Sequence, residues 1–271
     1  MKILSFSILL IIITVLTSCE KISDAVLPAA NEDLIVVEGW LNADKDFKGL
    51  RITHPVSLNQ NYNATSATVT DIDAYIRVNG IHIYPLHLFP DGYYRPLYGL
   101  IVRTDSLYEL LGNWNGSQFY ARTIIPKKPQ ISGVTYIQDN SNNTSHIEVK
   151  ISADTNKVYG AKWVILYTDT SSQFNNIVEY QTGVTDNTVI AKTTDLPAKY
   201  LSTNYNLSTY VIVSEFDPQY IDYFNTKQNN QISGNPFTQA NGSVNWNVKG
   251  EKAIGLFIGV NTSPPFNVSR Q

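Results

Sequence analysis

The segment DIDAYIRVNGIHIY, residues 71–84, decides the fold class. Apolar and polar residues alternate along it on both sides of Asn79-Gly80, and a period of two residues is typical of a half-buried β-strand. Asn-Gly accepts the positive φ angles of a type I′ turn, so the segment predicts a β-hairpin with a two-residue loop. The cross-strand pairs predicted from this loop are Val78–Ile81, Arg77–His82 and Ile76–Ile83.

The same alternation recurs along most of the chain and predicts an all-β protein. Tyrosine occurs 17 times, Val, Ile and Thr are frequent, and Asn, Gly and Ser interrupt these runs at short intervals. Further alternating runs lie at residues 118–123, 147–151, 161–167 and 207–214. The proline-rich segment Pro126 to Gln130 divides the runs into two groups. We therefore expect two β-sandwich-like domains, Ig-like or fibronectin-like, over residues 34–126 and 131–271.

One segment near the C-terminus has a helical pattern. Asp217 suits the position that caps a helix, and Pro218 suits the first helical position. Large side chains then recur at three- and four-residue spacing: Tyr220, Tyr223, Phe224 and Lys227. This pattern predicts one short helix around residues 217–228.

The N-terminus has the pattern of a lipoprotein signal peptide. A basic start is followed by an apolar run from Ile3 to Leu16, which is shorter than the roughly 20 residues that a membrane-spanning helix needs. The run ends in Leu16-Thr17-Ser18-Cys19, which resembles a bacterial lipobox. The alternatives are a plain cleaved signal peptide and an uncleaved anchor.

Cys19 is the only cysteine of the 271 residues, so it has no partner for a disulfide. We expect residues 1–18 to be removed and Cys19 to be acylated, with residues 19–33 as a tether between lipid and fold. Several acyl chains on one residue hold a protein on a membrane durably, at about 0.8 kcal/mol per buried methylene group. The sequence thus predicts a lipid-anchored protein.

Charge and composition argue against a nucleic-acid partner. The formal net charge is −3, and the only adjacent pair of basic residues is Lys127-Lys128, which lies between two prolines. Phosphate binding depends on clustered Lys and Arg. We therefore expect no nucleic acid among the partners.

No local motif predicts an enzyme, a metal site or a cofactor. The four histidines form no metal-binding pair, and the sequence has no nucleophile elbow, glycine-rich phosphate loop or zinc-protease motif. Asp71 and Asp73 share one face of a predicted strand and are the best candidates for an acid/base pair. Charges that discourage aggregation at a strand edge are the competing explanation.

Aromatic residues give the remaining functional signal. Tyr93, Tyr94 and Tyr98 crowd one turn region and are predicted to form a binding surface, because exposed Tyr offers large contact area at low entropic cost. Packing in the core is the competing explanation for these residues. For Trp40, after Gly39 at a strand end, we prefer a core anchor to a ligand platform.

Two stretches carry a family resemblance. The first is Leu34 to Asn42, with the sequence LIVVEGWLN, and the second combines Asn235-Pro236-Phe237 with the run Gly255 to Gly259. They resemble the opening and closing elements of the domain-of-unknown-function 4249 family of Bacteroidota lipoproteins. The closing element departs from the family pattern where residues 238–242, TQANG, follow the Asn-Pro-Phe motif.

This resemblance implies an outer-membrane lipoprotein with an Ig-like first domain, often encoded near a TonB-dependent transporter. It implies no catalytic residues. We expect a non-catalytic binding or accessory component that partners such a transporter, on either the periplasmic or the extracellular side. The alternative is a surface hydrolase that acts on glycan or peptide, with Asp71 and Asp73 as its acids.

Overall fold

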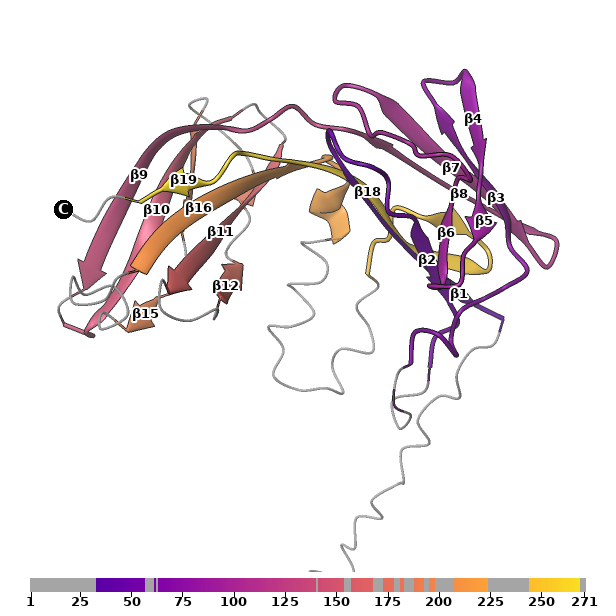
Figure 1. Cartoon of the computed structure of the whole chain (residues 1–271), viewed down its shortest axis with the longest axis horizontal. Coiled ribbons are helices and arrows are strands. Elements are labelled where there is room, and N and C mark those ends of the chain that lie inside the picture. Colours follow the sequence, from indigo (N-terminus) through magenta and orange to yellow (C-terminus); the bar gives the residue numbers. More distant parts are fainter. Residues whose placement is uncertain are drawn as a thin grey trace, which may run out of the picture.

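The computed structural model describes residues 33–56, 61, 63–139, 141–153, 157–167, 173–177, 181–182, 188–192, 195–197, 207–223 and 244–268. Within them the regular structure is β-strand apart from one short helix, which confirms the all-β prediction. The strands form three sheets (Figure 1). Outside the described residues lie the predicted signal peptide, the lipobox with Cys19, the tether up to residue 32 and the Asn-Pro-Phe motif at 235–237.

The largest sheet has ten strands and runs through both halves of the molecule (Figure 1). These are β1 (Ile35–Asn42), β2 (Leu50–Thr53), β5 (His87–Leu88), β6 (Tyr93–Arg95), β11 (Val158–Tyr167), β12 (Gln173–Ile177), β13 (Gln181–Thr182), β16 (Leu207–Phe216), β18 (Ala253–Thr262) and β19 (Phe266–Asn267). Their hydrogen-bonded order is β12-β11-β16-β18-β1-β2-β6-β5, with β13 on β11 and β19 on β16.

Two smaller sheets each cover one part of the large sheet. The five-stranded sheet has the order β17 (Lys249–Gly250), β8 (Ser117–Ile124), β7 (Leu107–Trp114), β3 (Asp73–Val78) and β4 (His82–Pro85). The four-stranded sheet has the order β14 (Thr188–Lys192), β10 (Thr144–Ser152) and β15 (Leu196–Pro197), with β9 (Gln130–Asp139) on β10.

The first core lies between the five-stranded sheet and strands β1, β2 and β18. Alternate residues of each strand point into it, as a period of two requires. Its fully buried side chains include Ile35, Val37, Leu50, Ile76, Leu110 and Phe257. The second core lies between the four-stranded sheet and strands β11 and β16, and contains Ile147, Val149, Ile151, Val211 and Val213.

The C-terminal strand β18 corrects the predicted domain limits. It pairs in parallel with β1 along residues 253–260 and antiparallel with β16 at its other end. Val248, Ala253 and Phe257 belong to the first core rather than the second. The predicted domain of residues 131–271 is therefore not one contiguous unit, because its last strand completes the N-terminal sandwich.

A glycine explains how β18 approaches β1 so closely. Gly255 has a φ angle of +140°, and a Cβ atom there would lie 1.9 Å from the Val37 carbonyl oxygen. Only glycine accepts this conformation and this contact without displacing the backbone. The glycine in the closing sequence element is thus a structural requirement of the parallel pairing.

The predicted helix is present, and its helical residues begin at Tyr220, two positions after the predicted start at Pro218. Residues 220–223 are helical, and the predicted continuation to 228 lies outside the described residues. Asp217 caps the turn, since its Oδ1 accepts from Gln219 N at 2.8 Å and its carbonyl accepts from Tyr220 N at 2.9 Å. A capping carboxylate stabilises the first turn by satisfying backbone N–H groups that have no helical acceptor.

Asp217 also ties this helix to the five-stranded sheet. The side chain is buried, and its Oδ2 accepts from Thr123 Oγ1 at 3.0 Å and from Ile124 N. Thr123 Oγ1 in turn accepts from Gly259 N at 2.7 Å. One carboxylate therefore joins the helix, β8 and β18.

The helix covers a third cluster of apolar side chains at the middle of the large sheet. This cluster contains Phe216, Tyr220, Leu256 and Ile258, and the partly buried Trp40 packs against it. The Trp40 ring lies 5.9 Å from the ring of Tyr220, and Tyr220 stacks on Phe216 at 4.8 Å. The interpretation of Trp40 as a core anchor is confirmed.

The turn predicted at Asn79-Gly80 is present. Both residues have positive φ angles, +51° and +72°, and Ile81 N donates to Val78 O at 3.1 Å. The predicted register of the flanking strands, however, is wrong by one residue. The observed pairs are Val78–His82, Arg77–Ile83 and Ile76–Tyr84.

Contacts with β7 accompany this shift. Asn79 N donates to Leu107 O at 2.9 Å, and Asn79 Oδ1 accepts from Leu107 N at 2.8 Å, so the turn is bonded to the neighbouring strand as well as to its own hairpin. Ile81 is then an extra loop residue. The shift exposes Ile81 and Ile83 to solvent and places Tyr84 against the first core.

Candidate functional site

The predicted surface of Tyr93, Tyr94 and Tyr98 lies on and beside β6, and its three residues have different surroundings. Tyr94 is buried, with 2% of its surface exposed, and its hydroxyl donates to Val69 O at 2.7 Å. Burial raises the pKa of this hydroxyl. Tyr94 is therefore a core residue, and the prediction that it belongs to a contact surface is wrong.

Tyr93 is half-buried and helps to hold the β5–β6 hairpin in place. The guanidinium carbon of Arg51 lies 4.4 Å from the Tyr93 ring centre, and that of Arg95 lies 4.2 Å from the Phe89 ring centre. Arg95 also donates to Asp91 Oδ2 at 2.8 Å. These cation–π and ionic contacts link β2, β6 and the loop between β5 and β6.

The loop of residues 96–100, which follows β6, carries the exposed part of the predicted surface. Leu97 is 64% exposed and Tyr98 is 85% exposed. Pro96 and Leu100 at the two ends of the loop are buried, and Leu100 O accepts from Phe47 N at 2.8 Å. The two apolar side chains thus project from a loop whose ends are fixed in the fold.

A shallow pocket of about 260 Å³ lies beside this loop. Its lining includes Phe47, Phe89, Arg95, Leu97 and Tyr98. The combination of aromatic, apolar and arginine side chains is typical of protein–protein contact sites. We call this pocket and the loop of residues 96–100 the loop surface.

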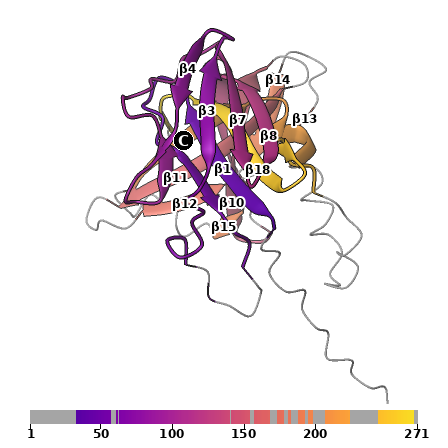
Figure 2. The ribbon, with the colours of Figure 1, turned by 90° about the vertical axis from the view of Figure 1, so that its right-hand side faces the viewer.

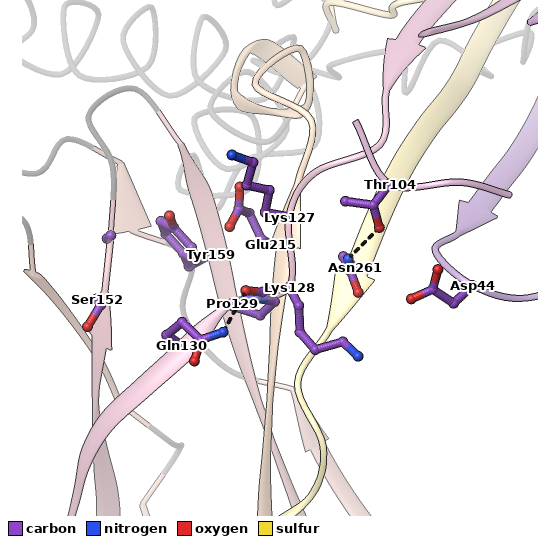
Figure 3. Close-up of a pocket in the computed structure, with 11 residues that line it drawn as sticks. Asp44, Thr104, Lys127, Lys128, Pro129, Gln130, Ser152, Tyr159, Glu215 and Asn261 are labelled. Carbon is purple, nitrogen blue, oxygen red and sulfur yellow. Dashed lines mark hydrogen bonds between the residues drawn. The ribbon is translucent and has the colours of Figure 1, made fainter. Parts of the chain in front are cut away.

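A larger groove of about 740 Å³ lies where the two sandwiches meet (Figure 3). The linker residues Lys127 and Lys128 pass through it and point to opposite sides (Figure 3). Asn261 fixes the linker, because its Nδ2 donates to Pro126 O at 3.0 Å and to Thr104 Oγ1 at 3.3 Å. The buried Glu215 on the groove wall forms an ion pair with Lys157 at 2.7 Å.

The two residues of the candidate acid pair, Asp71 and Asp73, have different surroundings. Asp71 Oδ1 accepts from the indole nitrogen of Trp114 at 3.2 Å, so this carboxylate has a structural contact. Asp73 is exposed at the start of β3, opposite Asn113. Within the described residues, no group of three or more His, Cys, Asp or Glu could hold a metal ion.

A groove lined by two tyrosines lies on the outer face of the five-stranded sheet. The sequence patterns did not predict this groove. In register across β3, β7 and β8 lie Tyr75, Leu111 and Tyr120, and a depression of about 260 Å³ lies among them. Strands β4, β3, β7 and β8 lie in front in Figure 2, with no other described element over them. Alternation along each strand places these residues on the outer face, but only the strand pairing brings the two tyrosines together.

An ion pair supports one side of this groove. Arg77 donates to both carboxylate oxygens of Glu109, at 2.7 and 2.9 Å, and the Tyr120 hydroxyl donates to Glu109 Oε1 at 3.1 Å. The hydrogen bond from Arg77 lowers the pKa of Glu109, so this carboxylate stays ionised. Burial, together with the bond to Glu109, raises the pKa of Tyr120.

The comparisons with known proteins identify the family. The family described as Domain of unknown function (DUF4249) matches residues 20–264. The chain belongs to the DUF4249 family. The match covers strands of all three sheets up to β18, so both sandwiches of this DUF4249 protein fall within one family unit. No curated protein sequence matches the chain.

In the part of this DUF4249 protein that the structure describes, no helix is long and apolar enough to cross a membrane. The predicted lipid anchor at Cys19 and its lipobox residues Leu16, Thr17 and Ser18 precede the first described residue. Lipidation therefore remains a prediction from the sequence.

Proposed function

We propose that this DUF4249 protein is an outer-membrane lipoprotein, anchored through Cys19, that acts as a non-catalytic binding component and partners a TonB-dependent transporter. The lone cysteine at the end of a 14-residue apolar run supports the anchor. The resemblance to Bacteroidota lipoproteins supports the membrane and the partner. The lipid anchor and the transporter partnership are predictions from the sequence. Membrane fractionation tests the anchor, and co-purification tests the partnership.

The observation that carries the binding role is the exposure of Leu97 and Tyr98 on a loop with buried ends. An exposed apolar pair on a fixed loop loses little conformational entropy when a partner covers it. Tyrosine is enriched among the residues that dominate interface energies. The loop surface is therefore the proposed contact with the transporter.

Membrane confinement strengthens such a contact. A lipid anchor and a membrane-embedded partner share one surface, which raises the effective concentration of each for the other. A modest interface centred on two side chains then suffices for a stable association. The anchor and the loop surface are two parts of one binding mechanism.

The test uses the full-length protein with a C-terminal affinity tag in its native membrane. Leu97→Ala combined with Tyr98→Ala is expected to reduce the transporter recovered with the protein by about tenfold. Ile190→Ala is the matched control, because Ile190 is 45% exposed on β14 in the other sandwich. Cys19→Ala is expected to move the protein from the membrane to the soluble fraction.

Two results would contradict the proposal. One is the absence of any transporter in the wild-type preparation. The other is equal recovery from the loop double variant and from Ile190→Ala. An intact mass with an unmodified Cys19 would separately remove the anchor.

A further inference from the structure

Two tyrosines flank the groove on the outer face of the five-stranded sheet. Tyr75 pairs with Leu111, and Leu111 pairs with Tyr120, so the tyrosines stand two strands apart. Two inter-strand spacings place their backbones roughly 10 Å from each other. The depression of about 260 Å³ between them has room for one ring of a ligand.

The next row of the groove is polar, and its one charged residue, Asp73, is balanced within the groove by Lys249. Asp73, Asn113 and Gln118 pair across the same three strands, and Lys249 pairs with Tyr120 on the far side. This row thus offers one carboxylate and two amides, and the tyrosine row adds one ammonium. Amides both donate and accept hydrogen bonds, and a carboxylate accepts them, which suits a ligand rich in hydroxyl groups.

The wall of the groove at Tyr120 is fixed before any ligand binds. The hydroxyl of Tyr120 donates to Glu109, and Arg77 holds that carboxylate with two hydrogen bonds. Tyr120 as a whole remains 37% exposed while its hydroxyl is held by Glu109. A side chain held in this way loses less conformational entropy on binding than a free one.

We propose that this groove binds a neutral oligosaccharide, with one sugar ring between Tyr75 and Tyr120. The C–H groups on the face of a sugar ring carry slight positive charge and pack against the negative face of an aromatic ring. The hydroxyl groups at the sugar's edge pair with Asp73, Asn113 and Gln118. The open sheet face lets a longer chain continue beyond the groove on either side (Figure 2).

The charges in the groove favour a neutral ligand over an ionic one. A site for anions would present clustered basic side chains, whereas here Lys249 is balanced by Asp73. Apolar anchors of a peptide would need deep pockets, and the groove is shallow and edged by polar groups. This site is separate from the loop surface, so the inference is independent of the transporter partnership.

The test titrates full-length lipidated protein with soluble neutral gluco-, xylo-, manno- and galacto-oligosaccharides by isothermal calorimetry. The detergent must lack a sugar headgroup, since such a headgroup would compete for the groove. At least one neutral oligosaccharide is expected to bind with a dissociation constant of about 1 mM or tighter. Tyr75→Ala and Tyr120→Ala are each expected to weaken that binding by about tenfold.

Three further variants separate ring contact from folding. Tyr120→Phe keeps the ring and loses the hydroxyl, so binding should stay within about threefold of wild type. Gln118→Ala removes an exposed amide and should weaken sugar binding. This variant keeps the test decisive if Tyr75→Ala or Tyr120→Ala fails to fold. Tyr98→Ala lies on the loop surface and should leave sugar binding unchanged.

The proposal is overturned if no neutral oligosaccharide binds, or if only an acidic one such as oligogalacturonate does. It is also overturned if binding survives Tyr75→Ala, Tyr120→Ala and Gln118→Ala. Transporter co-purification is measured on the same variants. Loss of sugar binding with retained co-purification separates this site from the proposed partnership.

Discussion

Asp217→Ala is expected to lower the free energy of unfolding more than any change at a surface carboxylate of this protein. The substitution removes the buried acceptor for three donors: Thr123 Oγ1, Ile124 N and Gln219 N. Two of these donors lie on β8, and the third begins the helix. The change therefore acts on the cap and on the contact between the helix and the sheet.

The magnitude follows from those hydrogen bonds. Losing a helix cap costs about 1 kcal/mol, and a buried donor left without an acceptor costs about 1 to 3 kcal/mol. Because neighbouring losses are not additive, we expect about 3 to 5 kcal/mol in total. Asp217→Asn keeps the shape and one acceptor oxygen, so it should cost about 1 to 2 kcal/mol.

Urea unfolding, followed by tryptophan fluorescence, measures these differences on Cys19→Ala protein, in which the predicted acylation site is absent. Asp33→Ala is the control, because the Asp33 side chain is 82% exposed and lies 3.9 Å from Lys252. It should change stability by about 0.5 kcal/mol or less. A loss below about 1 kcal/mol for Asp217→Ala would refute the role given to this carboxylate.

Three further predictions concern single residues. Tyr94→Ala should lower stability by about 3 to 5 kcal/mol because it empties a buried site, whereas Tyr98→Ala should change it by less than about 0.5 kcal/mol; urea unfolding that ranks them the other way would reverse the core and surface assignments. Gly255→Ala should prevent correct pairing of β1 with β18, because the added Cβ atom would lie 1.9 Å from the Val37 carbonyl oxygen. A variant with the circular dichroism spectrum and the melting temperature of wild type would contradict this prediction. Asp139 should titrate at a pKa of about 2 in the folded protein, because Ser141 and Asn142 donate hydrogen bonds to its carboxylate. The ionised Asp139 carboxylate contributes its full stabilisation of the fold above the ordinary pKa of 3.8, and this contribution is lost as the pH falls through about 2. An NMR titration of this carboxyl group with a midpoint near 3.8 would show that the loop does not hold the charge.

Local sequence patterns were enough to predict the all-β class, the Asn79-Gly80 turn and strands at residues 118–123, 147–151, 161–167 and 207–214. The Asn79-Gly80 turn and the Asp217 cap both depend on neighbouring residues, which a sequence displays directly. The register of β4 did not follow, because Asn79 is also bonded to Leu107 on a strand far along the chain. The parallel pairing of β18 with β1 joins residues more than 200 positions apart, and no local pattern encodes it.

The candidate sites also differ in how far the sequence could predict them. Alternation along β6 places Tyr93 and Tyr94 on opposite faces, so the sequence held a signal that both could not be exposed. Tyr75 and Tyr120 each stood on the polar face of a predicted strand. Only the pairing of β3 and β8 with β7 brings the two tyrosines to one groove. The sequence pattern of a single strand does not predict this pairing.

Site-specific photocrosslinking from position 98 in living cells tests the proposed function most directly. A photoreactive phenylalanine analogue replaces Tyr98 in one strain and Ile190 in another, and adducts are identified by mass spectrometry after membrane isolation. The proposed function predicts an adduct with a TonB-dependent transporter from position 98 and none from position 190. No transporter adduct at position 98, or equal adducts from both positions, would contradict it.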